Sequence, residues 1–120
     1  MKTFSQKAAA IAALGSLAAL MATGAQAHAH LVTAVPAASA AVAGPVKLHL
    51  TFSEALTPKF SKAVLSRADG AAVAVKSVAK GKAIDAAPVA PLTPGDYKVT
   101  WQAVASDGHK MTGEYSFTVK

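Results

Sequence analysis

Hydrophobic and polar residues alternate one by one along three segments of the chain. Every second residue is apolar, and the residues between are mostly polar or charged, in segments 46–53, 97–103 and 114–120. A period of two places alternate side chains on opposite faces of a strand, whereas a helix repeats every 3.6 residues. The pattern is typical of antiparallel sheets that bury one face in a core and expose the other to water.

Turn-forming residues separate the predicted strands. Asp69-Gly70 lies between two apolar runs, 63–66 and 71–75, and predicts a hairpin because both turn residues tolerate positive φ. Pro94-Gly95-Asp96 directly precedes Tyr97. A tyrosine that opens a late strand is typical of the corner of an immunoglobulin-like sandwich, where its hydroxyl bonds upstream backbone. The sequence therefore predicts an all-β fold, a Greek-key β-sandwich of about seven strands.

Two alanine-rich stretches, 37–43 and 83–90, are ambiguous in this pattern. Prolines flank both of them, at positions 36, 45, 88 and 91. Proline interrupts helices and strands, so we expect both stretches to be loops with at most a weak strand.

The first 27 residues have the three-part pattern of a secretory signal peptide. Lys2 and Lys7 precede an apolar run over 8–20, and the segment closes with Ala25-Gln26-Ala27, an A-x-A cleavage site. The run is short and alanine-rich for a membrane span, and no later segment is apolar over a sufficient length. We expect cleavage after Ala27, leaving one secreted domain, residues 28–120, that does not span a membrane.

Composition narrows the functional classes. Removal of Lys2 and Lys7 lowers the formal net charge from +6 to +4, and the remaining lysines form no compact run, so nucleic acid is a poor partner. The chain has no cysteine, which excludes disulfides, thiolate metal sites and thiol catalysis. Met111 is the one methionine that remains after cleavage.

Cleavage after Ala27 would give His28 a free α-amine in addition to its imidazole. These two nitrogens can close a chelate ring on one metal ion and leave its other positions open. The amine loses its proton to a strongly bound metal at modest cost. Imidazole suits copper, zinc and nickel, affinity in the divalent series peaks at Cu(II), and Cu(II) prefers a tetragonal set of nitrogens.

A second candidate element is Ser106-Asp107-Gly108-His109, which joins the last two predicted strands. Gly108 lets the backbone turn, so that the side chains of Asp107 and His109 can face one point. The alternative is a plain solvated loop, in which Asp-Gly is only turn chemistry. A histidine at the cleavage site favours the metal-binding interpretation.

The other two histidines are weaker candidates. His49 alternates with Leu48 and Leu50, so it faces away from the core as a solvated strand residue. His30 would be the third mature residue, where an amine, two deprotonated amides and an imidazole can wrap Cu(II) or Ni(II). Amides of a strand are committed to hydrogen bonds, which disfavours that arrangement. We keep His30 as a secondary candidate that hydrogen-bonds within the site.

The chain resembles the CopC copper-resistance family over essentially its whole mature length, and the order and spacing of four segments carry this resemblance. They are His28-Ala29-His30-Leu31, the segment LTFSE at 50–54, the segment LTPGDYKVTW at 92–101, and SDGH at 106–109 with Gly113 and Phe117 after it. The family is a periplasmic cupredoxin-like or immunoglobulin-like sandwich that binds and carries copper. The resemblance implies a periplasmic Cu(II) carrier or buffer for copper homeostasis or resistance, and not an enzyme.

The resemblance also implies roles for matching residues. His28 would supply its amine and ring, and His109 its ring, as equatorial nitrogens on Cu(II). Asp107 would lie beside the metal as a weaker or axial oxygen ligand. Glu54 would belong to the same site as a hydrogen-bond acceptor. Its position continues the core-facing alternation of 46–52, where a carboxylate is costly to bury unpaired; the alternative is a strand-end glutamate exposed to water.

One feature departs from a branch of that family. Some members hold Cu(I) through the thioether sulfurs of a methionine-rich loop, since thioethers suit the softer ion. The corresponding stretch here, 71–87, contains no methionine, and Met111 alone cannot make that site. We therefore expect Cu(II) binding only.

Two other functions fit parts of the sequence. A copper-dependent oxidase of the histidine-brace type shares the amine-plus-imidazole site but uses a flat aromatic face, and the aromatics Tyr97, Trp101, Tyr115 and Phe117 are expected in the core here. A metal-free immunoglobulin-like interaction module fits the fold, which hosts many functions. We expect a monomer whose partners are the copper ion and an inner-membrane copper transport protein.

Overall fold

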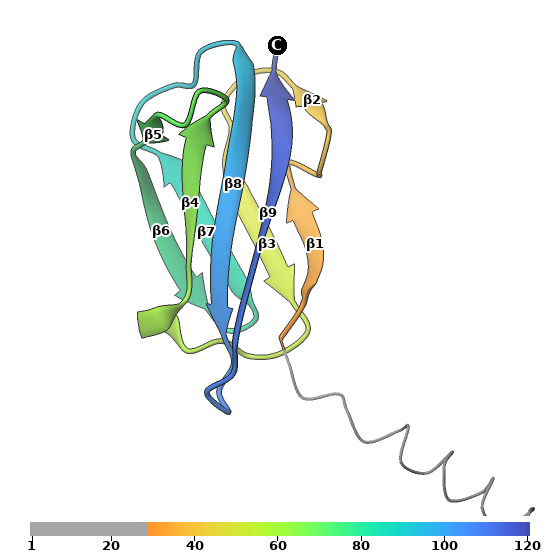
Figure 1. The fold of residues 1–120 in the computed structure, drawn as a ribbon, viewed down its shortest axis with the longest axis vertical. Coiled ribbons are helices and arrows are strands. Elements are labelled where there is room, and N and C mark those ends of the chain that lie inside the picture. Colours follow the sequence, from red (N-terminus) through yellow and green to blue (C-terminus); the bar gives the residue numbers. More distant parts are fainter. Residues whose placement is uncertain (1–28) are drawn as a thin grey trace, which may run out of the picture.

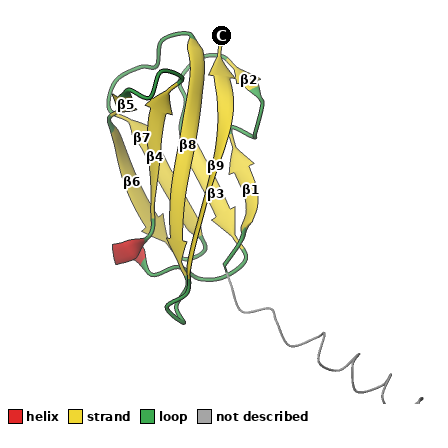
Figure 2. Ribbon diagram, in the orientation of Figure 1, coloured by secondary structure: helices red, strands yellow, loops and turns green. Residues whose placement is uncertain are grey.

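The computed structural model describes residues 29–120, which form two sheets packed face to face (Figure 1). One sheet has the strand order β1-β3-β7-β6 and the other the order β2-β9-β8-β4-β5. The strands are β1 (Leu31–Val35), β2 (Ala41–Val42), β3 (Leu48–Phe52), β4 (Lys62–Arg67), β5 (Ala72–Val73), β6 (Val75–Lys80), β7 (Ala83–Pro88), β8 (Gly95–Val104) and β9 (Lys110–Val119). Within these residues the one helical element is a 3-10 turn, η1 (Pro58–Phe60) (Figure 2).

The predicted all-β sandwich is confirmed. Two of the nine strands in this part of the chain, β2 and β5, have only two residues, so the longer strands match the expected number of about seven. The predicted signal peptide and His28 lie outside the described residues.

The alternating segments place their apolar residues between the sheets as expected. Leu48, Leu50 and Phe52 of β3 are buried, while His49 between them is exposed. From the other sheet, the long hairpin of β8 and β9 contributes buried residues that include Trp101 and Phe117. Each such side chain contributes roughly 1.5–3 kcal/mol when it leaves water, so the alternation itself holds the two sheets together.

Both predicted turn features are present. β4 and β5 pair antiparallel around Asp69-Gly70, where Gly70 has φ +90° and the Asp69 carboxylate accepts a 2.9 Å hydrogen bond from the Ala71 amide. The Tyr97 hydroxyl donates a 2.6 Å hydrogen bond to the Thr93 carbonyl, which is the expected corner contact.

The expectation that 83–90 is a loop is wrong. Residues 83–88 form β7, an interior strand that pairs with β3 on one side and β6 on the other. Alanine is a poor strand former, but the two neighbouring strands satisfy the backbone and the core buries Ile84 and Ala86, so tertiary context overrides propensity. The other alanine-rich stretch is a loop with the short strand β2, as expected.

The hydroxyl of Tyr115, at the margin of this core, is a buried polar group without a hydrogen-bond partner among the described residues. The ring of Tyr115 packs against the core. Burial raises the pKa of Tyr115 to about 12. An unpaired buried hydroxyl costs free energy, so removing it relieves a penalty and breaks no bond in the described chain.

We therefore expect Tyr115→Phe to have a free energy of unfolding equal to wild type or up to about 1 kcal/mol higher at neutral pH. The raised pKa means that the folded state holds the phenolic proton more tightly than the unfolded state. This contribution is complete below pH 10 and is lost as the pH rises through about 12. Urea unfolding at neutral and alkaline pH checks both points: the variant should lose less stability on alkalinisation, and a destabilised variant at neutral pH would contradict the prediction.

Candidate metal site

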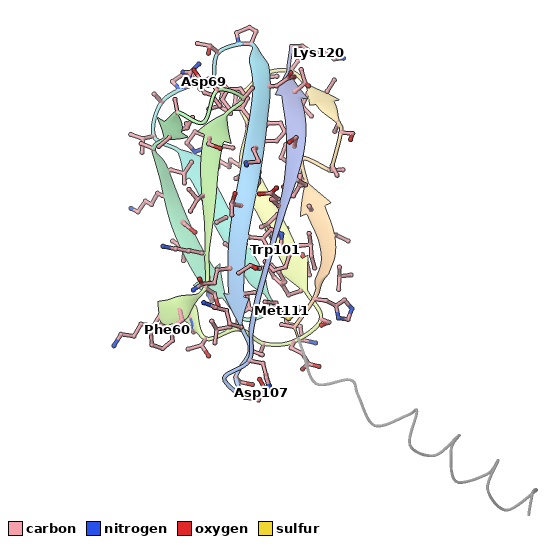
Figure 3. The ribbon with its side chains drawn as sticks, in the orientation of Figure 1. Phe60, Asp69, Trp101, Asp107, Met111 and Lys120 are labelled. Carbon is pink, nitrogen blue, oxygen red and sulfur yellow. The ribbon has the colours of Figure 1, made fainter. Side chains whose placement is uncertain are left out.

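The loop between β8 and β9 is a tight turn at the lower end of the sandwich, where Asp107 projects from the fold (Figure 3). The Gly108 amide donates to the Ala105 carbonyl at 2.9 Å, and the Ala105 amide donates to the His109 carbonyl at 2.9 Å. Gly108 has φ +90°, a conformation that side chains rarely adopt, so glycine is needed here. The turn brings the side chains of Asp107 and His109 into contact with each other.

Asp107 orients His109 through two contacts. One carboxylate oxygen accepts a 3.0 Å hydrogen bond from the His109 amide, and the other lies 2.9 Å from Nδ1 of the ring. A carboxylate at Nδ1 favours the proton on that nitrogen, which leaves Nε2 as the atom with a lone pair for a metal. Both side chains are exposed at the surface. The loop is thus solvated, but its side chains have the arrangement of an oriented metal-binding histidine.

Glu54 lies near this loop, but its side chain does not face the core as the alternation of residues 46–52 predicted. β3 ends at Phe52 and the chain turns, so Glu54 is exposed and the expectation of a core-facing carboxylate is wrong. The turn instead places Glu54 beside Asp107, because both line one cleft of about 200 Å³ together with Ser106. The Ser106 amide donates a 3.2 Å hydrogen bond to the carbonyl of Ala55, which ties the two segments together.

The described chain begins close to Glu54. The His30 amide donates a 3.0 Å hydrogen bond to Oγ of Ser53, and the Ser53 amide donates a 2.9 Å hydrogen bond to the His30 carbonyl. Nδ1 of His30 lies 3.2 Å from the same Oγ. The His30 amide is therefore engaged, which disfavours its deprotonation on a metal. His28, the central residue of the predicted site, lies outside the described residues.

Within residues 29–120, no three His, Cys, Asp or Glu side chains gather as a metal site. Asp107 and His109 form a pair, with Glu54 across the small cleft. A Cu(II) site built on this pair needs nitrogen ligands from elsewhere, and the part of the chain before residue 29 is where the sequence predicts them.

His49 is exposed, as expected, on the outer face of the four-stranded sheet. Its Nδ1 lies 2.5 Å from a carboxylate oxygen of Asp85, its cross-strand partner on β7. Sequence reasoning missed this partner because it took the β7 segment for a loop.

The four aromatic residues expected in the core are there. Tyr97, Trp101 and Phe117 are buried, and Tyr115 packs against them. Among the described aromatic residues Phe60, in η1, is the large exposed one, with 55% of its surface accessible. Sequence reasoning did not single it out, although Pro58-Lys59-Phe60 interrupts the alternation between β3 and β4.

The described residues contain no helix long and apolar enough to cross a membrane. Fold and loop chemistry together define a small β-sandwich with an aspartate-oriented histidine on an end loop. Residues 31–120 match the family model of the CopC domain. The chain belongs to the CopC family.

Individual relatives agree with this assignment. Copper resistance protein C from Escherichia coli is 43% identical over 116 residues, which cover 88% of this chain and 92% of the relative. The crystal structure of PcoC, described as a methionine-rich copper resistance protein from E. coli, is 46% identical with a TM-score of 0.70 and covers 78% of this chain and 100% of that one. CopC from Methylosinus trichosporium OB3b is 31% identical with a TM-score of 0.71, covering 78% and 94%.

Proposed function

We propose that this protein is exported to the periplasm, where it binds Cu(II) and carries or buffers it for copper homeostasis and resistance. Its relatives are named as copper resistance proteins, which supports the general role. The observation that carries the specific role is the double contact of Asp107 with His109, because it orients an exposed imidazole for a metal. Copper is the cargo of such a protein and not a catalytic group.

The proposed ligands come from both ends of the mature chain. Cleavage after Ala27 frees the amine of His28, which with its own ring and Nε2 of His109 supplies three nitrogens to Cu(II). In the described conformation the Asp107 carboxylate faces Nδ1 of His109, so it would have to rotate toward the copper to act as the weaker oxygen ligand that we assign to it. Glu54 accepts a hydrogen bond from a ligand or is a further oxygen ligand. The contacts between His30 and Ser53 support this arrangement, since they hold the start of the described chain next to Glu54.

Cu(II), and not Cu(I), is the proposed cargo. PcoC is described as methionine-rich. This chain has three methionines, of which only Met111 lies within 28–120. Nitrogen and carboxylate oxygen suit Cu(II), and thioether sulfur suits Cu(I).

A carrier fits the aromatic side chains better than an oxidase does. An enzyme that acts on polysaccharide would need an exposed aromatic face, and three of the four predicted core aromatics are buried while the fourth packs against them. A metal-free interaction module would leave the orientation of His109 by Asp107 without a purpose.

A Cu(II) titration tests the proposal, comparing the 28–120 protein with the same protein carrying one extra residue before His28. We expect one tight equivalent with a nitrogen-rich electron paramagnetic resonance spectrum for the first. We expect a loss of at least about 100-fold in affinity for the second, because the α-amine becomes an amide. Equal binding by both proteins, or none by either, would contradict the proposed site.

A further inference from the structure

The fold gathers lysines that are scattered in the sequence. The loops that carry Glu54 and Asp107 lie at one end of the sandwich, together with η1 and the turn between β6 and β7 (Figure 1). Five exposed lysines surround this end, and we call them the basic rim: Lys59, Lys62, Lys80, Lys82 and Lys110. Glu54 and Asp107 are the acidic residues of the same end, so the rim holds most of the positive excess of the described chain.

The basic rim is unfavourable for the capture of a bare dication. Lysine charges close to a cation-binding loop raise the local potential and repel Cu²⁺. A group of positive charges at this position therefore needs another reason, and an anionic partner supplies one.

Phe60 stands in this rim, held by the backbone around it. Its amide donates to the Thr57 carbonyl at 3.1 Å, and its carbonyl accepts a 2.8 Å hydrogen bond from the Gln102 side chain. The next residue, Ser61, is buried, and its hydroxyl accepts a 3.0 Å hydrogen bond from the Val104 amide. An exposed aromatic side chain on such an anchored turn costs little entropy to bury, which is the property of an interface anchor.

The turn that carries Phe60 is bonded to the same strand end as the metal loop. The Thr57 amide donates to the Val104 carbonyl at 2.7 Å, and the Thr57 hydroxyl donates to the Ala105 carbonyl at 3.3 Å. Ala105 also donates its amide to the carbonyl of His109. These bonds fix the turn that carries Phe60 to the end of β8 from which the metal loop begins, so a molecule that covers Phe60 would meet the same end of the sandwich that carries His109.

We infer that this end of the sandwich docks an acidic protein surface that carries an apolar pocket for Phe60. The inference rests on the proposed function in one respect: copper at His109 would then be transferred to or from that partner at this end of the sandwich. An anionic lipid surface would also attract the lysines of the basic rim, but a flat surface does not fit the shape of this end of the sandwich. Asp107 projects farther from the fold than Phe60 does (Figure 3), so a flat bilayer would meet this carboxylate before the aromatic ring.

Site-specific photo-cross-linking in the native host tests the inference, with p-benzoylphenylalanine replacing Phe60 in the full chain. The matched control replaces Val89, which is 73% exposed and lies in the loop that follows β7 at the other end. We expect position 60 to cross-link to a protein segment rich in Asp and Glu, identified by mass spectrometry. We expect Lys59→Glu combined with Lys62→Glu to lower the yield by about tenfold, because like charges repel at the interface.

Three outcomes would overturn the inference: equal yields from positions 60 and 89, a yield unaffected by the charge reversals, or flotation with phosphatidylglycerol vesicles that Phe60→Ser abolishes. Cu(II) titration of Phe60→Ser separates this inference from the proposed function, because its affinity should equal that of wild type. Cross-linking that behaves as expected in a protein that binds no Cu(II) would retain the docking surface and refute the copper role.

Discussion

His109→Ala should lower the Cu(II) affinity of the 28–120 protein by at least about 100-fold. Loss of a residue that only orients a ligand costs 10–100-fold in affinity, and loss of the ligand itself costs more. The exposed position of His109 means that the substitution removes little packing, so the fold should survive. Competition with a chelator of known affinity measures the change, and electron paramagnetic resonance should show one nitrogen fewer on the bound copper.

Two variants make this result specific. Asp107→Asn should weaken binding by about tenfold, because the amide retains the shape but loses the charge beside Nδ1. His49→Ala should leave the affinity unchanged, since His49 pairs with Asp85 on the outer face of the other sheet. Unchanged affinity in His109→Ala would exclude His109 as a ligand, and an equal loss in His49→Ala would show that the effect is not specific to the loop that carries His109.

Gly113→Ala should be the most destabilising small substitution in the hairpin of β8 and β9. Gly113 lies opposite Trp101 in the register, and a Cβ at this position would clash with Cζ2 of the indole and stand 2.7 Å from its Cε2. The indole cannot easily move, because it is buried and packs edge-on against Phe52 with ring centroids 5.1 Å apart. The glycine is therefore required by the close approach of the ring and not by backbone conformation.

We expect Gly113→Ala to lower the free energy of unfolding by about 1–3 kcal/mol, the usual cost of overpacking a core. For a domain of this size each kcal/mol lowers the melting temperature by roughly 4–8 °C. Thermal unfolding followed by Trp101 fluorescence measures the shift. Ser116→Ala, at an exposed position on the same strand, is the matched control and should stay within about 0.5 kcal/mol of wild type. A Gly113→Ala protein as stable as Ser116→Ala would contradict the prediction and show that the indole of Trp101 can move to accommodate the added methyl group.

Part of the candidate site could be read from the sequence because it is local. Asp107 and His109 are two residues apart, and the glycine between them predicts a turn that brings the side chains together. Glu54 is different, because its position depends on where β3 ends and on which loop packs against it. The alternation was extended to Glu54, two residues past the end of β3, and so predicted a buried carboxylate, whereas the chain turns after Phe52 and exposes it.

The sequence by itself determined which face of each alternating strand is buried, where the hairpin at Asp69-Gly70 turns, and that Tyr97 closes a corner. These features follow from periodicity and turn chemistry, which act over a few residues. Tertiary structure alone decided that an alanine-rich segment becomes the interior strand β7, since its neighbours supply the hydrogen bonds. It also decided that the dispersed lysines lie at the same end of the sandwich as Phe60 and the metal loop, because the strands of a sandwich return their loops to the same end.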